Sequence, residues 1–276
     1  MKKKISWSKC YLLLVFVLLY LPIFYLIFYS FNAGGSMTSF TGFTLEHYQA
    51  VFEDKRLIGI VLNTFMLAFL SALIATTIGT FGAMMIYYTK KRKNRNVLMS
   101  VNNILMVSPD VIIGASFLIF FTFLGLSLGF SSVLLSHVAF SIPIVVLMVL
   151  PKLQEMNDSM IDAARDLGAN NWTVIRKVIL PFITPGVIAG YFMAFTYSLD
   201  DFAVTFFVTG NGFSTLSVEI YSRARQGVSL EINALSALLF LFSLFLVIGY
   251  YFISQGNLSK SQRKRRKEHG EVANSL

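Results

Sequence analysis

Three aspartates stand inside long apolar runs of the sequence, where a charged side chain is costly. Asp110 follows Pro109 in one run, and Asp200 and Asp201 lie near the end of another. At the centre of a bilayer a carboxylate costs at least ~2.5–3.5 kcal/mol on insertion scales, so such residues usually face a bundle interior or a water-filled path. Because these runs contain no Lys or Arg, we expect the positive partner of the acids to be a substrate, an ion, a proton or a neighbouring chain.

An aromatic side chain accompanies the acids. Tyr197 precedes Asp201 by one helical turn, so in a helix the two side chains would share a face. A carboxylate beside an aromatic ring suits an ammonium group. Two simpler interpretations stay open: Asp200 and Asp201 can be solvated near the outer interface, and Asp110 can form a helix–helix hydrogen bond in its protonated form.

The sequence offers little for other kinds of chemistry. His137 stands in an apolar run with no His, Asp or Glu at ligand spacing, which favours a packed neutral histidine over a metal ligand. There is no Cys/His cluster, no evident nucleophile–base pair and no GxxxxGK(S/T) phosphate loop. We therefore expect no metal site, no cofactor and no enzymatic activity in this chain. If ATP drives it, another subunit must hydrolyse the ATP.

The composition is that of an integral membrane protein. Of the 276 residues, 55% are hydrophobic and only 13% are charged, whereas a soluble domain carries roughly 25% charged residues. The mean hydropathy is +0.67. The net charge of +9 would suit nucleic-acid binding in a soluble protein. Here the basic residues cluster at the ends of the apolar runs, which indicates membrane topology and no nucleic-acid partner.

Six apolar runs are long enough to cross a bilayer, which takes roughly 20 residues in a helix. We expect an all-α membrane protein with six transmembrane helices, at about 11–31, 60–88, 97–126, 131–150, 182–208 and 234–253. Residues 1–10 would precede this transmembrane domain, placed at 11–255, and residues 256–276 would form a basic tail that can also contact the lipid bilayer.

The distribution of basic residues predicts the orientation. All but four of the 23 Lys and Arg residues lie at the chain ends or in the second and fourth connections; the other four are Lys55, Arg56, Arg223 and Arg225. By the positive-inside rule, both termini are then cytoplasmic. The first run is longer than the apolar part of a typical signal peptide, so we expect a retained helix.

The fourth connection has a helical pattern of its own. Gly168 is suited to ending one short helix, since glycine readily adopts the left-handed conformation. Asn170 or Asn171 can cap a second short helix, and Pro181 is expected to end it. The segment 157–181 is thus predicted to be a cytoplasmic helix–turn–helix, a docking surface for another protein.

This connection resembles the EAA loop of ABC-importer permeases. The motif has an acid and two alanines, a glycine four positions later, nine intervening residues, and then aliphatic-x-Leu-Pro. The matching residues are Asp162, Ala163, Ala164, Gly168, Val178, Leu180 and Pro181. The sequence departs from the motif with Asp for the usual Glu and Val for the usual Ile. The resemblance implies that these residues couple the chain to a cytoplasmic ATPase, which binds ATP and Mg²⁺.

The likeness extends over nearly the whole chain. The segments 106–110, 166–169, 198–201 and 207–210 look like those of PotC-type permeases of spermidine/putrescine importers. This resemblance implies the six-helix type I ABC importer (MetI-like) fold in a bacterial cell membrane. It also implies a heterodimer with a sister permease, two copies of an ATPase, and an extracytoplasmic polyamine-binding protein. Asp110, Asp200 and Asp201 match acids of the substrate path in that family.

Two other functions stay open on the sequence. A permease of the same fold could carry another substrate, although iron or thiamine would not require the paired aspartates. A proton-coupled secondary transporter could use Asp110 as its proton relay, and it would work without any ATPase. A membrane enzyme is disfavoured because no catalytic constellation is visible.

Overall fold

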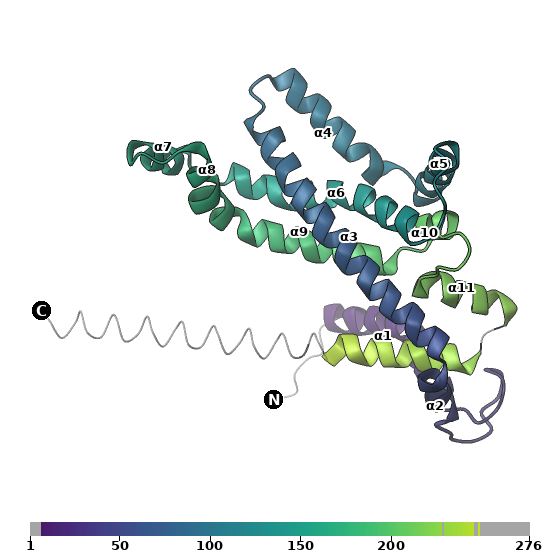
Figure 1. Cartoon of the computed structure of the whole chain (residues 1–276). Helices are drawn as coiled ribbons and strands as arrows, with labels where there is room; N and C mark the ends of the chain where they lie inside the picture. Colours follow the sequence, from purple (N-terminus) through teal and green to yellow (C-terminus); the bar gives the residue numbers. More distant parts are fainter. Residues whose placement is uncertain (1–6, 228, 246–247, 249–276) are drawn as a thin grey trace, which may run out of the picture. The chain divides into compact units, whose positions relative to one another are not determined.

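A computed structural model describes residues 7–227, 229–245 and 248, and the regular structure of these residues is helical (Figure 1). Apart from helices it contains only an isolated bridge between Asn32 and Phe43. The helices are α1 (Trp7–Tyr29), α2 (Glu46–Glu53), α3 (Lys55–Tyr88), α4 (Arg92–Val107), α5 (Asp110–Phe123), α6 (Phe130–Gln154), α7 (Asp158–Asp166), α8 (Asn171–Val174), a π-helical turn (Ile175–Ile179), α9 (Leu180–Asp200), α10 (Ala203–Val208) and α11 (Leu216–Gln226). A further apolar helix spans Leu230–Phe245. The expectation of an all-α protein is confirmed.

The chain divides into two compact units, which are described separately. One contains the residues up to Lys55 together with those from Arg223 onwards, and the other is Arg56–Ser222. The second unit holds almost all of α3 and every helix from α4 to α10, and with them every residue of the candidate site.

Four helices are long and apolar enough to cross a membrane: Lys9–Tyr29, Lys55–Tyr88, Phe130–Gln154 and Asn171–Asp200. They overlap the first, second, fourth and fifth expected spans. The fifth, expected at 182–208, begins earlier in the structure and ends at Asp200, before the separate helix α10. The sixth, 234–253, begins inside the helix Leu230–Phe245, and its later part lies largely outside the described residues. The number of six spans and the location of the termini stay predictions.

The third expected span, 97–126, is divided in the structure. α4 ends at Val107, α5 begins at Asp110, and the two helices are bent by 103°. Ser108 and Pro109 between them are extended, with ψ of 139° and 134°. Proline disfavours a helical conformation in the residue before it and lacks the N–H that would continue the helix. Asp110 is consequently the first residue of a helix, where the macrodipole favours a negative charge.

The expected helix end at Pro181 is wrong. A continuous helical segment runs from Asn171 to Asp200, and Pro181 lies near the start of α9 within it. The wide turn Ile175–Ile179 precedes the proline, and the N–H of Leu180 bonds to the carbonyl of Ile175, five residues back. Since proline cannot donate to the regular ladder and its ring needs room, this turn is the local adjustment that lets the helix pass through it.

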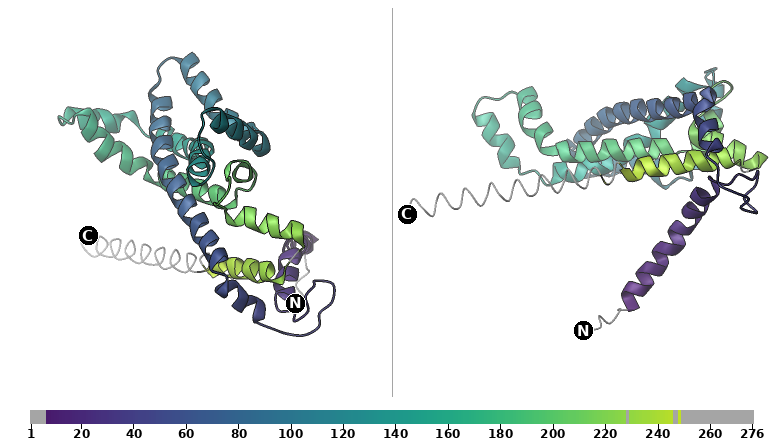
Figure 2. Two further views of the ribbon diagram at one scale, coloured as in Figure 1. Left: turned by 45° about the vertical axis from the view of Figure 1, so that its right-hand side comes forward. Right: turned by 90° about the horizontal axis from the view of Figure 1, so that it is seen from below.

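The core of the second unit is the pair α6 and α9 with α3 packed against it (Figures 1 and 2). Small residues permit the close approach. A Cβ on Gly79 of α3 would lie 2.7 Å from the Cβ of Val145, and one on Gly186 of α9 would lie 2.8 Å from the carbonyl oxygen of Met148. Such interfaces of small residues are typical of packed membrane helices. α7 and α8 lie at one end of this pair.

A second core joins α5, α6 and α10 at the opposite end of the pair. It includes the buried side chains of Ile113, Val133 and Val204. Gly114 allows α5 to contact the α10 backbone, because a Cβ there would lie 3.0 Å from the Cα of Val204. This contact fixes the start of α5 beside the end of α9, and so brings the expected acids into one region.

Candidate functional site

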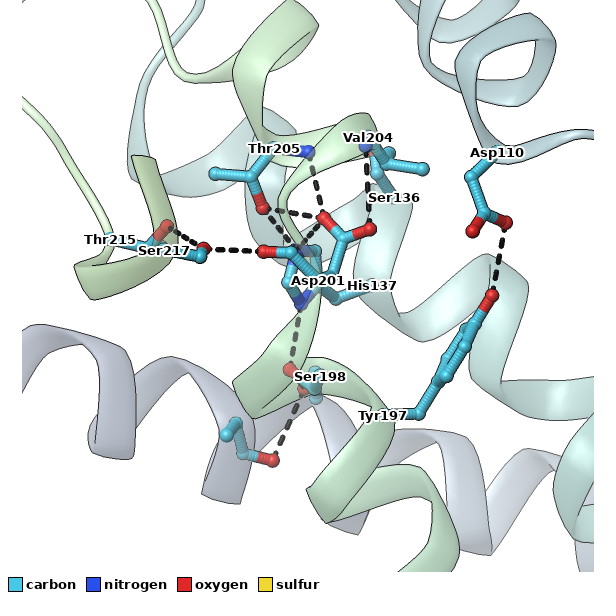
Figure 3. Close-up of polar contacts among 12 residues, drawn as sticks. Asp110, Ser136, His137, Tyr197, Ser198, Asp201, Val204, Thr205, Thr215 and Ser217 are labelled. Atoms are coloured by element: carbon cyan, nitrogen blue, oxygen red, sulfur yellow. Dashed lines mark hydrogen bonds and ion pairs between the residues drawn. The ribbon is translucent and has the colours of Figure 1, made fainter. Parts of the chain in front are cut away.

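Asp110 and Tyr197 meet in the structure. The hydroxyl of Tyr197 on α9 donates a hydrogen bond of 3.0 Å to Oδ1 of Asp110, the first residue of α5 (Figure 3). Both side chains are exposed, with Tyr197 at 38%. The tyrosine ring is held from behind by Phe140 of α6, whose ring lies 5.0 Å away and perpendicular to it. The site therefore presents a carboxylate beside an aromatic ring, which suits a cation.

Asp200 and Asp201 lie in different surroundings although they are adjacent. The side chain of Asp200 is exposed, whereas Asp201 is buried at 9% exposure. The carboxylate of Asp201 accepts hydrogen bonds from the backbone N–H groups of Val204 (3.3 Å) and Thr205 (2.8 Å) and from the Thr205 hydroxyl (2.8 Å) (Figure 3). These groups belong to the first turn of α10, so Asp201 acts as a cap of that helix.

The backbone of the second unit explains the difference. α9 ends at Asp200, and Asp201 is extended with ψ of 123° before α10 begins at Ala203. The N–H of Asp201 still bonds to the carbonyl of Tyr197 (3.1 Å), one helical turn back, and the chain leaves the helix after Asp201. The aromatic–carboxylate pair expected of Tyr197 and Asp201 is nevertheless formed by Tyr197 and Asp110, because Asp201 binds the start of α10. The solvated interpretation is wrong for Asp201, while it stays open for Asp200. The helix–helix hydrogen bond considered for Asp110 is present, with the tyrosine as donor.

His137 lies beside Asp201 in the structure, a contact that residue spacing in the sequence did not predict. Its ring is fully buried, and Nε2 lies 2.8 Å from Thr205 Oγ1 and 3.5 Å from Oδ2 of Asp201. Nδ1 lies 2.7 Å from Oγ of Ser198 (Figure 3). The hydroxyl of Ser198 is itself 3.0 Å from Oγ of Ser71 on α3. The histidine is packed, as expected, but it is not alone. Its partners are 61 and 68 residues away in the sequence, beyond the reach of a spacing argument.

The helix–turn–helix at the other end of the α6–α9 pair has the expected local structure. Asn157 caps α7 by accepting from the N–H of Ser159, and Asn170 caps α8 by accepting from the N–H of Thr173. Gly168 has φ of +80°, so the left-handed turn predicted there is confirmed. The two helices are consequently fixed at both of their starts and at the turn between them.

The motif residues of this segment lie mostly at its surface. The more exposed are Asp162, Ala163, Gly168 and Pro181, and the half-buried are Ala164, Val178 and Leu180. Four of them, Ala163, Ala164, Val178 and Pro181, line an open hollow with Met160, Leu167, Lys177 and Phe182. Leu167 is 89% exposed beside Gly168. An exposed apolar tip beside a hollow is typical of a surface that another protein covers.

Comparison with known proteins finds permeases of polyamine transport systems among the relatives of this chain. The chain is 37% identical over 241 residues to the spermidine/putrescine transport system permease protein PotC of Escherichia coli K12, covering 87% of this chain and 91% of the relative. It is 36% identical to the protein of the same name from Haemophilus influenzae, covering 90% and 96%. It is 34% identical to the putrescine transport system permease protein PotI of Escherichia coli K12, covering 84% and 85%.

Solved structures show the same fold. A chain of a bacterial ABC transporter involved in the import of alginate matches with a TM-score of 0.68 at 16% identity, covering 88% of this chain and 93% of that one. A chain of an inward-facing methionine ABC transporter matches with a TM-score of 0.59 at 20% identity, covering 72% and 97%. The expected MetI-like ABC importer fold is confirmed.

The family match covers most of the chain, from residue 75 to residue 264. It includes the break before Asp110, the α7–α8 segment and the α9–α10 break. The protein belongs to the family of binding-protein-dependent transport system inner membrane components.

Proposed function

We propose that this chain is a permease subunit of an ATP-driven importer that carries polyamines, spermidine or putrescine, into the bacterial cytoplasm. The observation that carries the proposal is the pairing of Tyr197 with Asp110, together with the exposed Asp200 three residues further along α9. Polyamines are linear polycations, and carboxylates with an aromatic face are the groups that attract them. The printed functions of the relatives point to the same substrate class.

In this proposal Asp110, Tyr197, Asp200 and Asp201 form the path site, with the first three exposed and Asp201 as its buried end. The acids lower the free energy of a cation that has left water, since an unpaired charge in the membrane is costly. We expect several weak contacts of this kind, because a substrate must also leave the site.

The α7–α8 segment is the proposed contact with the ATPase. Its exposed motif residues would enter a cleft of the partner, and the partner binds ATP and Mg²⁺. The rigid caps and the continuous helix from Asn171 to Asp200 provide a direct connection between that contact and the path site. The chain itself then needs no cofactor and catalyses no reaction.

The complete importer would contain a sister permease, two copies of the ATPase and an extracytoplasmic binding protein. Its membrane would be the bacterial cytoplasmic membrane, with six spans in this chain and both termini in the cytoplasm. We expect the binding protein to set the preference between spermidine and putrescine.

The test is uptake of radiolabelled spermidine and putrescine by proteoliposomes that contain the whole importer. Uptake should require both ATP and the ATPase subunit. Asp110→Asn should lower it roughly tenfold, since a charged hydrogen-bond acceptor is lost. Glu46→Gln is the matched control, because Glu46 is an exposed acid at the start of α2, outside the long apolar helices; it should transport like the wild type.

The same experiment separates the other functions. A proton-coupled secondary transporter would accumulate substrate without the ATPase, in response to a pH gradient. A permease for another substrate would hydrolyse ATP in response to its own binding protein but would not accumulate polyamine. Either result would remove the polyamine-importer proposal.

A further inference from the structure

His137 lies where four helices of the Arg56–Ser222 unit meet. It belongs to α6, and its two ring nitrogens contact Ser198 of α9 and Thr205 of α10 (Figure 3). Ser198 in turn contacts Ser71 of α3. The ring is fully buried and packs on Phe140, with ring centroids 4.8 Å apart. A buried polar group is held in this way only when its hydrogen bonds are satisfied, because an unpaired one costs free energy.

The hydrogen bonds determine one proton of the ring. The hydroxyl of Thr205 donates to Oδ2 of Asp201, and a hydroxyl has only one proton to give. Its oxygen must therefore accept from His137, so Nε2 carries a hydrogen. The side chains form a continuous chain of donors that ends on the carboxylate of Asp201.

The other side of the ring is satisfied in either protonation state. In the neutral ring, Nδ1 accepts from the hydroxyl of Ser198, which accepts in turn from Ser71. In the protonated ring, Nδ1 donates to Ser198, which donates to Ser71, and Ser71 donates to the carbonyl of Ala68. In the neutral arrangement the single proton of Ser71 goes to Ser198, so only its bond to the carbonyl of Ala68 differs between the two. The contacts of His137 with Ser198 and Thr205 are made in both arrangements.

This network uses most of the hydrogen-bonding capacity of Asp201. Its carboxylate accepts three hydrogen bonds from Val204 and Thr205 and has His137 as a further neighbour. Its own carbonyl accepts a bond of 2.6 Å from the hydroxyl of Ser217. A carboxylate bound by its own chain on both oxygens has little capacity left for a direct contact with a cation. It holds the turn between α9 and α10 instead.

A second set of contacts joins His137 to the exposed part of the site. The ring supports Phe140, Phe140 stands edge-on to Tyr197, and Tyr197 donates to Asp110. Ser198, which His137 also binds, directly follows Tyr197 in α9. The orientation of the tyrosine thus depends on His137 through its ring neighbour and through its backbone neighbour.

We propose that His137 is a positioning residue of the substrate path: together with Thr205 and Asp201 it fixes the α9–α10 turn, and through Phe140 it orients Tyr197. The carboxylates that a polyamine contacts are then Asp110 and Asp200, while Asp201 acts from inside the protein. The polyamine in this inference rests on the proposed function, whereas the positioning contacts of His137 do not.

The first test compares two substitutions of Thr205 in the whole importer. Thr205→Val keeps the shape and removes the hydroxyl, which leaves Nε2 of His137 without its acceptor; Thr205→Ser restores the hydroxyl. We expect a roughly tenfold loss of ATP-dependent spermidine uptake in the valine variant, as for a buried donor left unpaired, and near wild-type uptake in the serine variant. His137→Leu should lose uptake as well, and His137→Gln, which can still donate to Thr205, should recover part of it.

Ser141→Ala is the matched control for the loss of a buried hydroxyl. Ser141 lies one turn beyond His137 on α6, is fully buried, and has no hydrogen-bond partner in the described part of the chain. This variant should transport like the wild type. Co-purification of the subunits reports whether each variant assembles. If His137→Leu fails to assemble, the comparison of Thr205→Val with Thr205→Ser still tests the positioning role of His137. Equal uptake by the valine and serine variants, in an importer that transports polyamine, would overturn the inference alone.

The second test does not depend on the cargo. The chain has one cysteine, Cys10, so Cys10→Ser combined with Asp200→Cys gives a single thiol beside the α9–α10 turn. Its labelling rate with a cationic thiol reagent should change when Thr205→Val is added and stay unchanged with Thr205→Ser. If the wild type takes up no polyamine, the proposed function fails, and the labelling rate of the thiol at position 200 still tests the positioning role of His137. Identical rates in all three proteins would remove it.

Discussion

Asp201 and Tyr197 lie one helical turn apart, yet the structure gives them opposite environments. The buried Asp201 accepts from the first turn of α10, and the exposed Tyr197 donates to Asp110 across to α5. Removing the carboxylate of Asp201 disturbs buried hydrogen bonds at the α9–α10 turn, whereas removing the hydroxyl of Tyr197 disturbs one exposed hydrogen bond of the site. The two side chains are therefore separable by substitution.

Asp201→Asn should lower both stability and uptake. An asparagine has one acceptor oxygen and one NH₂ donor. Because both oxygens of Asp201 accept hydrogen bonds, the NH₂ group of the asparagine would face an N–H or O–H donor and leave it without an acceptor. A buried donor left unsatisfied costs about 1–3 kcal/mol. Thermal unfolding of the assembled importer in detergent should show a lower midpoint, and spermidine uptake should weaken. An unchanged midpoint would contradict the capping role.

Tyr197→Phe is the companion substitution to Asp201→Asn. It removes the hydroxyl that bonds Asp110 but keeps the ring that packs on Phe140. We expect the thermal midpoint to stay within experimental error, because the lost bond lies at an exposed position, and uptake to fall. A stability loss equal to that of Asp201→Asn would mean that the tyrosine hydroxyl also serves the fold.

At the scale of elements, the turn between α7 and α8 depends on one backbone conformation. Gly168 has φ of +80°, and a Cβ there would meet no heavy atom within 4 Å. Only the backbone conformation, and not space, restricts the residue at this position. Branched side chains are strained at positive φ, whereas asparagine tolerates it.

Gly168→Val should therefore uncouple the importer, and Gly168→Asn should retain most of its activity. The valine variant should keep ATP hydrolysis by the complex but lose its link to spermidine uptake, because the proposed contact with the ATPase is distorted. The ratio of substrate transported to ATP hydrolysed, measured in proteoliposomes, gives the result directly. Unchanged coupling in the valine variant would remove this turn from the proposed contact.

The close approach of α5 and α10 gives a second prediction at this scale. A Cβ on Gly114 would lie 3.0 Å from the Cα of Val204 and 3.1 Å from the carbonyl oxygen of Ala203. Gly114→Ala must push α10 away, which moves Asp110 relative to the α9–α10 turn, so uptake should fall several-fold even though alanine favours a helix by roughly 1 kcal/mol. Gly82→Ala is the control, since its Cβ would make an ordinary contact of 3.6 Å with Val146; it should leave uptake unchanged.

The sequence was sufficient for elements that local chemistry determines. The long apolar helices, the left-handed Gly168 and the cap at Asn170 follow from hydropathy, backbone preference and side-chain length. The continuation of the helix through Pro181 could not be predicted in this way, because it depends on the wide turn Ile175–Ile179 that precedes the proline. The sharp bend before Asp110 could not be predicted either, since a proline indicates that a helix breaks but not the angle of the break.

The site was predictable only in part for a related reason. A carboxylate in an apolar run is visible in the sequence, so Asp110, Asp200 and Asp201 could be named. Which of them is exposed depends on where α9 ends, and which side chain binds His137 depends on contacts across more than 60 residues of sequence. Long-range packing of this kind leaves no local pattern.

At the scale of the whole molecule, the proposed function depends on which side of the membrane each connection faces. The positive-inside rule predicts a cytoplasmic N-terminus, a cytoplasmic α7–α8 segment and an external connection around Gly35. The proposed function needs this orientation, because the ATPase contact must face the cytoplasm while the substrate enters from the other side.

The single native cysteine makes the orientation testable. In intact cells a membrane-impermeant maleimide should leave Cys10 unlabelled and should label it after permeabilisation, since Cys10 is exposed and precedes most of α1. In a Cys10→Ser background, Gly35→Cys should be labelled without permeabilisation. Gly35 has no heavy atom within 4 Å of an added Cβ, so the substitution itself is tolerated. Labelling of Cys10 in intact cells would invert the topology and put the α7–α8 segment beyond the reach of any cytoplasmic ATPase.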